Sequence, residues 1–426
     1  MFGENEARRC RADFPSLARR HEGNRRPLAY LDGPAGTQVP AAVIEAIAGY
    51  YRSCNANTHG QFDTSRESDA LIAAARETAA AFLGAPTGRT ISFGQNMTTL
   101  CYSLSHALGR ELAAGDEVVI TQLDHEANRG PWIGLRERGV NVKEVRLRPD
   151  GRLDYEDMAA KIGPRTHVVA MGLSSNALGT VNDAAVARAL SRAVGAILVL
   201  DAVHYAPHFP IDVAALDPDY LLCSAYKFYG PHVGILYARP GLLEKLEPDR
   251  LRTQDQTAPE RFETGTLNHA ALAGVKAAIE YMAAWGDGTT LRERIVSAVS
   301  AIAEHEHALA RRYDETVRYV PGVKRWGVGF DEGPRAPTVS ITIEGVTAEA
   351  AARRLGDQGV LVWDGNFYAL RPIEVLGLVE RGGVLRAGFS MYNTAEEVDR
   401  LLTGVAEIAR APRCRSRGAA CARDRP

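Results

Sequence analysis

The chain has 426 residues, of which 46% are hydrophobic and 24% are charged, and its formal net charge is −2. This composition is typical of a globular protein with two or more packing units, and it excludes a disordered or fibrous chain. The nearly balanced charge and the lack of a basic stripe in the sequence argue against a nucleic-acid partner.

The start of the sequence is rich in arginine and has no apolar segment of the length that a signal peptide needs. No later segment reaches the roughly 18 uninterrupted apolar residues of a membrane span. We therefore expect a cytoplasmic protein with no membrane partner, whose first 28 residues form an N-terminal arm. The six cysteines show neither CxxC nor Cys/His ligand spacing, so neither a disulfide framework nor a metal site is expected.

Residues 29–285 alternate short apolar runs with helical patterns, which is typical of βαβ units. We predict a large, doubly wound α/β domain with a mostly parallel sheet, whose first part could also pack with a smaller domain. The expected strands are 90–93, 117–121, 167–173, 196–202, 220–224 and 234–238, and the expected helices include 69–83, 98–108, 128–138 and 184–193.

Residues 286–410 have a different pattern, in which longer helices alternate with a few strands. The expected helices are 290–313, 348–356 and 395–409, and the expected strands are 338–344, 360–363 and 384–389. This pattern predicts a smaller α+β domain at the C-terminal end. The arginine-rich residues 411–426 are expected to be a disordered tail without function.

A lysine and an aspartate follow two of the expected strands. Lys227 comes directly after the strand 220–224, at the end of a sheet strand where open α/β sheets bind ligands. Asp201 ends the apolar strand before it, and a buried carboxylate is costly unless a cation such as a pyridinium nitrogen compensates for it. The alternatives are a solvated lysine and an aspartate that caps a turn.

Two further strand ends carry polar groups. Asn96, Met97 and Thr98 begin the helix after the strand 90–93, and the N–H groups of a helix N-terminus bind anions such as phosphate. Plain N-capping by Asn96 or Thr98 is the alternative. His125 follows the strand 117–121, where a histidine can stack on an aromatic cofactor and transfer protons, unless it is simply an exposed loop residue.

With these segments in this order, the sequence resembles the class V aminotransferase superfamily of fold-type I pyridoxal 5′-phosphate (PLP) enzymes, and within it the cysteine desulfurase-like proteins. The resemblance implies the fold-type I architecture, PLP as cofactor and a homodimer with shared active sites. It runs from about Tyr30 to Leu401 and includes the motifs Asn57-Thr58-His59, Asp124-His125, Ser174 to Gly179, Asp201 to His204, Ser224 to Pro231, Arg261 to Thr266, Leu385-Arg386-Ala387 and Met391 to Thr394.

The resemblance implies a role for each matched residue. Lys227 corresponds to the lysine that forms a Schiff base with PLP, Asp201 to the partner of the pyridine nitrogen and His125 to the residue stacked on the ring. Arg386 and Asn176 correspond to the residues that bind the substrate carboxylate, and His59 is also assigned to the substrate site. Asn176 also corresponds to a residue near the ring hydroxyl of the cofactor. The remaining cofactor contacts are Asn96, Met97, Thr98, His204, Ser224 and Tyr226, together with Thr266 from the second subunit.

The sequence departs from the desulfurase pattern at three positions. His204 replaces a glutamine and Tyr226 replaces a histidine, and both can still form hydrogen bonds. In the segment 362–369, which aligns with the loop of the desulfurase nucleophile, Tyr368 occupies the position of the cysteine. A phenol cannot accept a sulfane sulfur as a thiolate does, so persulfide formation is not expected.

The leading expectation is therefore a lyase that acts at Cβ of a small amino acid, either as a C–S lyase or by expelling sulfinate or carbon dioxide. Lys227, His125, Asp201 and Tyr368 are its expected catalytic residues. The alternatives are a desulfurase-like activity, an amino-acid epimerase or aminotransferase, and a cofactor-binding scaffold or regulator that has lost catalysis.

Overall fold

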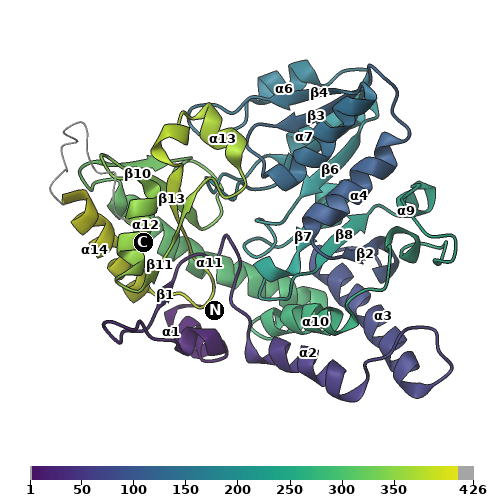
Figure 1. The fold of residues 1–426 in the computed structure, drawn as a ribbon, viewed down its shortest axis with the longest axis horizontal. Helices are drawn as coiled ribbons and strands as arrows, with labels where there is room; N and C mark the ends of the chain where they lie inside the picture. Colours follow the sequence, from purple (N-terminus) through teal and green to yellow (C-terminus); the bar gives the residue numbers. More distant parts are fainter. Residues whose placement is uncertain (1, 411–426) are drawn as a thin grey trace, which may run out of the picture.

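The computed structural model describes residues 2–410. A seven-stranded sheet, in the order β2-β8-β7-β6-β5-β3-β4, forms the centre of the larger part of the molecule (Figure 1). Strand β8 is antiparallel to both of its neighbours, and the other pairs are parallel. The strands are β2 (Ile91–Gly94), β3 (Glu117–Thr121), β4 (Asn141–Val145), β5 (Thr166–Gly172), β6 (Ile197–Asp201), β7 (Tyr220–Ser224) and β8 (Gly234–Ala238).

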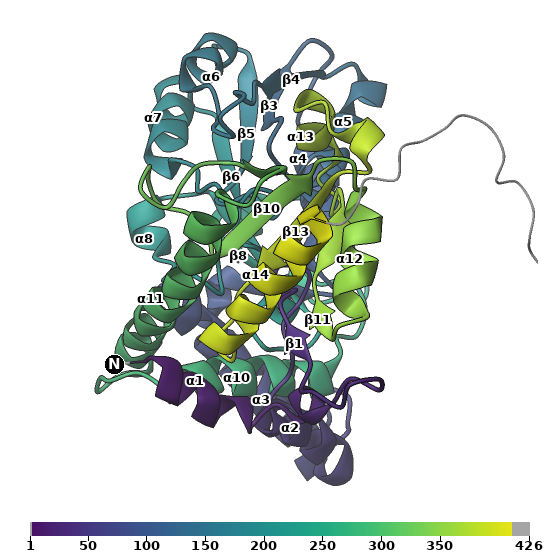
Figure 2. The same cartoon turned by 90° about the vertical axis from the view of Figure 1, so that its left-hand side faces the viewer.

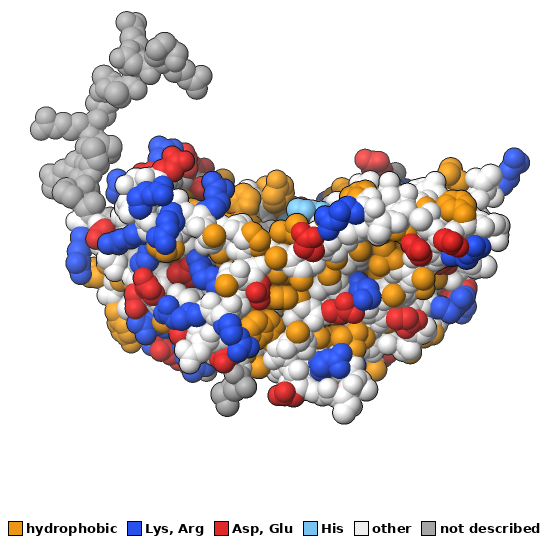
Figure 3. Space-filling model, turned by 90° about the horizontal axis from the view of Figure 1, so that it is seen from below, with side chains coloured by type: hydrophobic (Ala, Val, Ile, Leu, Met, Phe, Trp, Pro, Cys, Tyr) orange, Lys and Arg blue, Asp and Glu red, His pale blue; other side chains and the backbone are white. Residues whose placement is uncertain are grey.

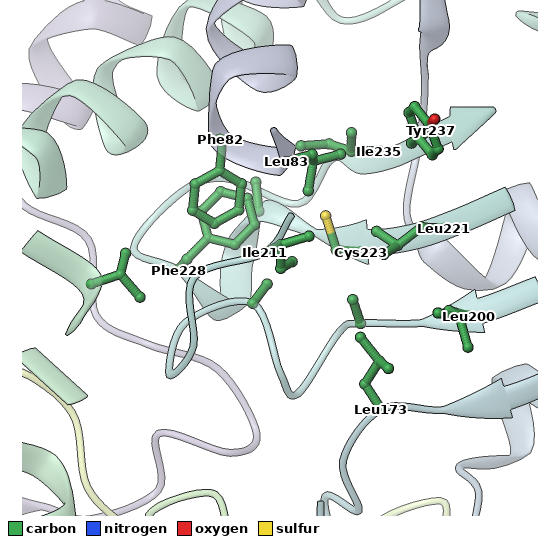
Figure 4. Packing of buried hydrophobic residues seen from close by; sticks show 14 of the residues in the cluster. Phe82, Leu83, Leu173, Leu200, Ile211, Leu221, Cys223, Phe228, Ile235 and Tyr237 are labelled. Atoms are coloured by element: carbon green, nitrogen blue, oxygen red, sulfur yellow. The ribbon is translucent and has the colours of Figure 1, made fainter. Parts of the chain in front are cut away.

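The sheet is buried on both faces, because its apolar side chains alternate between two hydrophobic cores. Leu198 and Leu200 of β6 pack with Leu221 of β7 in one core, and Val199 packs with Leu222 in the other. Figure 4 shows part of the first core, where the rings of Phe82 and Phe228 face each other with centroids 4.6 Å apart. The covering helices are α3 (Asp63–Leu83), α6 (Tyr155–Lys161), α7 (Ala184–Val194), α10 (His269–Ala283) and α11 (Leu291–Val317) on the first face, and α4 (Met97–Gly109) and α5 (Gly130–Ile133) on the second.

Two expectations for this region are corrected. The helix predicted over 128–138 is wrong: the segment forms three short pieces, η3 (Glu126–Asn128), α5 and η4 (Gly134–Arg138). Pro131 starts the second piece, because proline cannot continue a helix that would need its N–H. The edge strand β4 was not predicted, since its sequence is partly exposed and polar.

A second, antiparallel sheet has the order β12-β13-β10-β9 and lies beside α11 (Figure 2). The strand predicted over 360–363 is divided, and its first part, β11, pairs in parallel with β1 near the start of the chain. The elements are β1 (Ala29–Tyr30), β9 (Val323–Trp326), β10 (Thr338–Ile343), α12 (Ala348–Gly356), β11 (Val360–Leu361), β12 (Trp363–Gly365), α13 (Leu370–Val375), β13 (Val384–Gly388) and α14 (Ala395–Arg410).

The N-terminal residues pack against the body of the protein. Phe2, Cys10 and Phe14, in and around α1 (Glu4–Arg11), are buried in the first core, and α2 (Ala41–Ser53) packs on α10. The short helices α8 (Val213–Leu216) and α9 (Leu242–Lys245) complete the described part, in which no helix is both long and apolar enough to cross a membrane. The predicted α/β fold is confirmed, while the predicted tail 411–426 lies outside the described residues.

Candidate active site

A cavity of about 570 Å³ opens at the carboxyl ends of β5, β6 and β7, beside the N-terminus of α4. This is the edge of a doubly wound sheet at which ligands bind. The fold brings together ten of the predicted site residues here, from segments up to 131 positions apart. These are Asn96, Met97, Thr98, His125, Asn176, Asp201, His204, Ser224, Tyr226 and Lys227.

Lys227 is buried in this cavity and is 7% exposed. Its Nζ donates to the carbonyl oxygens of Pro34, at 2.5 Å, and Ala35, at 3.0 Å. Burial, reinforced by the positive charge of Arg386, lowers the pKa of Lys227 to about 7. A substantial fraction of this amine is therefore neutral near neutral pH, as a nucleophile or general base must be.

Two buried carboxylates lie beside the lysine. Asp201 ends β6, its Oδ1 accepts a 2.8 Å hydrogen bond from the Val203 N–H, and burial raises its pKa to about 6. Asp124 accepts hydrogen bonds from the Gly172 N–H and the Asn128 side chain, and burial raises its pKa to about 7. A cation in the cavity would stabilise both ionised carboxylates, as a pyridinium nitrogen near Asp201 would.

Three buried polar atoms on the cavity wall have no hydrogen-bond partner within residues 2–410: His204 Nδ1, Asn176 Oδ1 and Ser174 Oγ. Buried polar groups are nearly always satisfied, so polar atoms of a ligand are expected opposite them. The other ring nitrogen of His204 lies 3.1 Å from Thr338 Oγ1, and burial holds the pKa of His204 well below its usual value. These three uncharged groups without partners could therefore form hydrogen bonds with a cofactor whose ring carries polar substituents.

The N-terminus of α4 provides the expected anion site only in part. Asn96 forms a capping box with Thr99, so the alternative of plain N-capping by Asn96 is confirmed. The Met97 N–H donates to Ser224 Oγ at 2.9 Å. The Thr98 N–H, in the first turn of the helix, has no intrahelical acceptor and remains available for a phosphate together with the Ser224 hydroxyl.

His125 lies on the cavity wall with its Nδ1 accepting a hydrogen bond from the Ala127 N–H. Burial and the nearby positive charges of Lys227 and Arg386 lower its pKa to about 4. The imidazole is therefore neutral at physiological pH, and since Nδ1 is an acceptor, the ring proton is on Nε2, which can donate it. Its ring centroid is 5.8 Å from that of Tyr368, which is 72% exposed and does not itself line the cavity.

Arg386 of β13 is 1% exposed and does not line the cavity. Its Nη2 donates to Asp32 Oδ1 at 3.0 Å, and its Nη1 donates to the Asn176 carbonyl at 3.1 Å. The Phe367 ring covers it, with the centroid 3.9 Å from Cζ. Asp32 was not among the predicted site residues, although an aspartate that closely follows a short apolar segment was the available signal.

Thr266 and His59 lie elsewhere in this chain. They line a larger cavity of about 850 Å³ between α3 and the segment 251–269, which does not contain Lys227. We place the chemistry in the smaller cavity, because only there do a buried lysine and unsatisfied polar atoms converge. Ser174, Asp124 and His232 also line the smaller cavity and were not among the predicted site residues.

A family model for class V aminotransferases matches residues 29–401. The chain belongs to this family. A cysteine desulfurase of Serratia proteamaculans is 33% identical over 416 residues, which cover 94% of this chain and 97% of the relative. Among solved structures, the apo cysteine desulfurase of Thermococcus onnurineus has a TM-score of 0.84 and 28% identity, and the match covers 94% of this chain and 97% of that one.

A further solved structure shares the fold at 20% identity and a TM-score of 0.76, with 93% of this chain and 99% of that chain covered; its title describes a C-DES variant with glycine covalently linked to PLP. As a member of the class V aminotransferase family, the protein is a PLP-dependent enzyme of fold type I. The cavity fits this cofactor, since it contains a buried lysine, a carboxylate, unsatisfied polar atoms and a helix N-terminus.

The lowered pKa of Lys227 predicts how this class V enzyme takes up its cofactor. Only the neutral amine can attack the aldehyde of PLP, so the rate of covalent attachment to the apoprotein should rise with pH and level off above the pKa of about 7. We expect this rate to increase by about tenfold between pH 6 and pH 8. Stopped-flow absorbance of the cofactor measures it. A rate that keeps rising by a further hundredfold towards pH 10 would instead indicate an ordinary, unperturbed lysine.

Proposed function

We propose that the enzyme is a lyase that breaks a bond at Cβ of a small amino acid without forming a protein persulfide. The observation that carries this proposal is the loop beside His125, where Tyr368 and not a cysteine lies next to a residue of the cavity wall. Within residues 2–410, no cysteine lines the cavity: Cys10, Cys101 and Cys223 are buried elsewhere and Cys54 lies near α10. Cys414 and Cys421 lie outside the described residues.

PLP, when bound, withdraws electrons from the bonds at Cα of an attached amino acid, and this also allows a leaving group to depart from Cβ. Arg386 and Asn176 bind and orient the α-carboxylate of the substrate. Arg386 suits this task, because its planar guanidinium can form two parallel hydrogen bonds to a carboxylate.

Lys227 and His125 are the side chains that transfer protons in this proposal. With a pKa of about 7, a substantial fraction of the Lys227 amine is neutral near neutral pH, and this amine could remove the proton from Cα of the substrate. His125 is neutral as well, and it can donate the proton of its Nε2, because its Nδ1 accepts from the Ala127 N–H. Tyr368, whose ring lies near that of His125, can donate its phenolic proton to a departing group.

Asp201 and His204 act on the cofactor ring. The Asp201 carboxylate would hold a proton at the pyridine nitrogen of the bound cofactor, which would maintain the ring as an electron acceptor. His204 offers its unpartnered Nδ1 to a polar ring substituent while its other nitrogen is held by Thr338.

We further propose that the enzyme works as a cytoplasmic homodimer with shared sites. Thr266 is not near Lys227 in the single chain, so a second copy would have to supply it. The face seen from below in Figure 3 carries apolar side chains, and on α2 both Ile44 and Tyr51 are exposed. An exposed apolar surface of this kind suits a partner of the same chain.

The product formed from a sulfur amino acid tests the proposed reaction. The PLP-loaded enzyme is incubated separately with L-cysteine and with L-cysteine sulfinate, and alanine and pyruvate are quantified by mass spectrometry. From L-cysteine, β-elimination yields pyruvate with ammonia and sulfide in equal amounts. From L-cysteine sulfinate, pyruvate with sulfinate again indicates elimination, whereas alanine indicates that sulfur is removed and the amino acid is returned.

A desulfurase-like activity is the second candidate, and it is favoured by the name of the relative that is 33% identical. Alanine from L-cysteine, together with a persulfide on the protein, would support it and contradict the lyase. If neither substrate reacts, an epimerase or aminotransferase becomes the better description. Deuterium incorporation at Cα without elimination identifies the first, and amino transfer to a keto acid identifies the second.

A further inference from the structure

The loop before α13 has an unfavourable backbone conformation. Phe367 and Tyr368 are consecutive and both are left-handed, with φ angles of 56° and 57°. Residues with a Cβ rarely adopt this conformation, and it persists where surrounding contacts hold it, often at functional sites. The contacts of this loop therefore indicate what the conformation achieves.

Three hydrogen bonds hold the loop over the cavity. The Phe367 carbonyl accepts a hydrogen bond from Asn176 Nδ2 at 2.9 Å, and the Tyr368 carbonyl accepts one from the Glu126 N–H at 2.7 Å. The Tyr368 N–H donates to Asn366 Oδ1 at 3.0 Å. Two of these bonds connect the loop to the walls of the cavity, next to His125 and at Asn176.

The Phe367 side chain points inward and is 9% exposed. Its ring lies over the Arg386 guanidinium, with the centroid 3.9 Å from Cζ, in a cation–π contact. Asp32 and the Asn176 carbonyl pair with the guanidinium, while Arg386 Nε is buried without a partner. The arginine is thus enclosed and cannot contact a ligand in this conformation.

We propose that Phe367 is an internal plug of the carboxylate site, which a substrate must displace to bind. This inference rests on the proposed function, in which Arg386 and Asn176 bind the α-carboxylate. Phe367 contacts both of these residues. Its ring covers the Arg386 guanidinium, and its carbonyl oxygen accepts a hydrogen bond from Asn176 Nδ2.

The exchange preserves hydrogen bonding. When Phe367 leaves, a carboxylate oxygen replaces its carbonyl at Asn176 Nδ2, and the second oxygen reaches the unpartnered Arg386 Nε. Gly365, with a φ angle of 110°, can serve as the hinge, since glycine alone adopts this region readily. An amine without a carboxylate cannot make this exchange, so the plug selects for α-amino acids.

Stopped-flow absorbance of the holoenzyme with L-alanine tests the plug, because L-alanine has the α-carboxylate but no leaving group at Cβ. In the wild type, the observed rate should level off at high L-alanine concentration, as opening of the loop becomes limiting. In Phe367→Ala, the rate should increase linearly and the Kd should fall by about tenfold. Phe367→Leu, which retains apolar volume but loses the cation–π contact, should lie between them.

A second readout does not depend on amino-acid binding. Phenylglyoxal modifies accessible arginines, and peptide mapping by mass spectrometry should show Arg386 protected in the wild-type holoenzyme and modified about ten times faster in Phe367→Ala. Leu370→Ala, which removes a partly exposed apolar side chain just after the loop, is the matched control and should behave as the wild type in both measurements.

The outcomes separate the plug from the proposed function. Equal protection of Arg386 in the wild type and in Phe367→Ala would overturn the plug, and so would an unchanged plateau and Kd for L-alanine. A third outcome is that Phe367→Ala exposes Arg386 to phenylglyoxal, while L-alanine changes the spectrum of neither protein. This outcome would support Phe367 as the cover of Arg386, and it would overturn the assignment of the amino-acid site.

Discussion

Lys227→Ala is expected to abolish turnover, with a loss of more than about a thousandfold, because no other lysine lines the described cavity. The variant should also lack the visible absorbance of a covalently bound cofactor. Its stability should not fall, since the change removes a buried amine whose hydrogen bonds to Pro34 and Ala35 only partly offset its desolvation. Activity with each candidate amino acid, absorbance near 400 nm and thermal unfolding measure these effects.

Lys245→Ala is the matched control, because Lys245 is exposed on α9 and away from the cavity. It should retain full turnover and the same spectrum. Turnover by Lys227→Ala at a rate close to the wild type would remove Lys227 from the catalytic residues and would contradict the proposed mechanism as a whole.

Arg386→Leu is expected to reduce both kcat/KM and stability. Loss of the carboxylate partner should lower kcat/KM by about a hundredfold or more, mainly through KM. The change also leaves the nearly buried Asp32 without its ion-pair partner, which should cost about 3 kcal/mol in the free energy of unfolding. Steady-state kinetics and urea unfolding separate the two effects.

The double variant Asp32→Asn, Arg386→Leu is the informative control. Neutralising Asp32 together with its partner should recover most of the lost stability, because no uncompensated carboxylate then remains. It should not recover kcat/KM, since the guanidinium is still absent. Recovery of both quantities would indicate that Arg386 has a purely structural role.

The sequence predicted the central sheet well, because buried parallel strands have a strong and simple pattern. Strands β3, β7 and β8 begin and end where they were expected, and the ten cavity residues follow strand or helix ends. The predictions were weaker where local chemistry competes with periodicity. Pro131 divides the helix expected over 128–138, and the partly exposed β4 lacks an apolar alternation.

The loop contacts could not be predicted from the sequence in the same way. Nothing in the residues around Phe367 indicates that its ring lies on Arg386, since this requires two left-handed residues held by Asn176 and Glu126. The ion pair of Asp32 and Arg386 joins positions 354 apart, and the pairing of β1 with β11, together with the bridge from Asp32 to Gly388, brings them together.

This separation has a consequence for biosynthesis. Since β1 pairs with β11 and Asp32 forms a bridge to Gly388, the start of the chain cannot reach its final partners until nearly all of the protein has left the ribosome. The large sheet can fold earlier, because its strands all lie between Ile91 and Ala238. During synthesis, Asp32 therefore has neither Arg386 nor Gly388 as a partner until late, and closure of this long chain loop is among the slow final steps of folding.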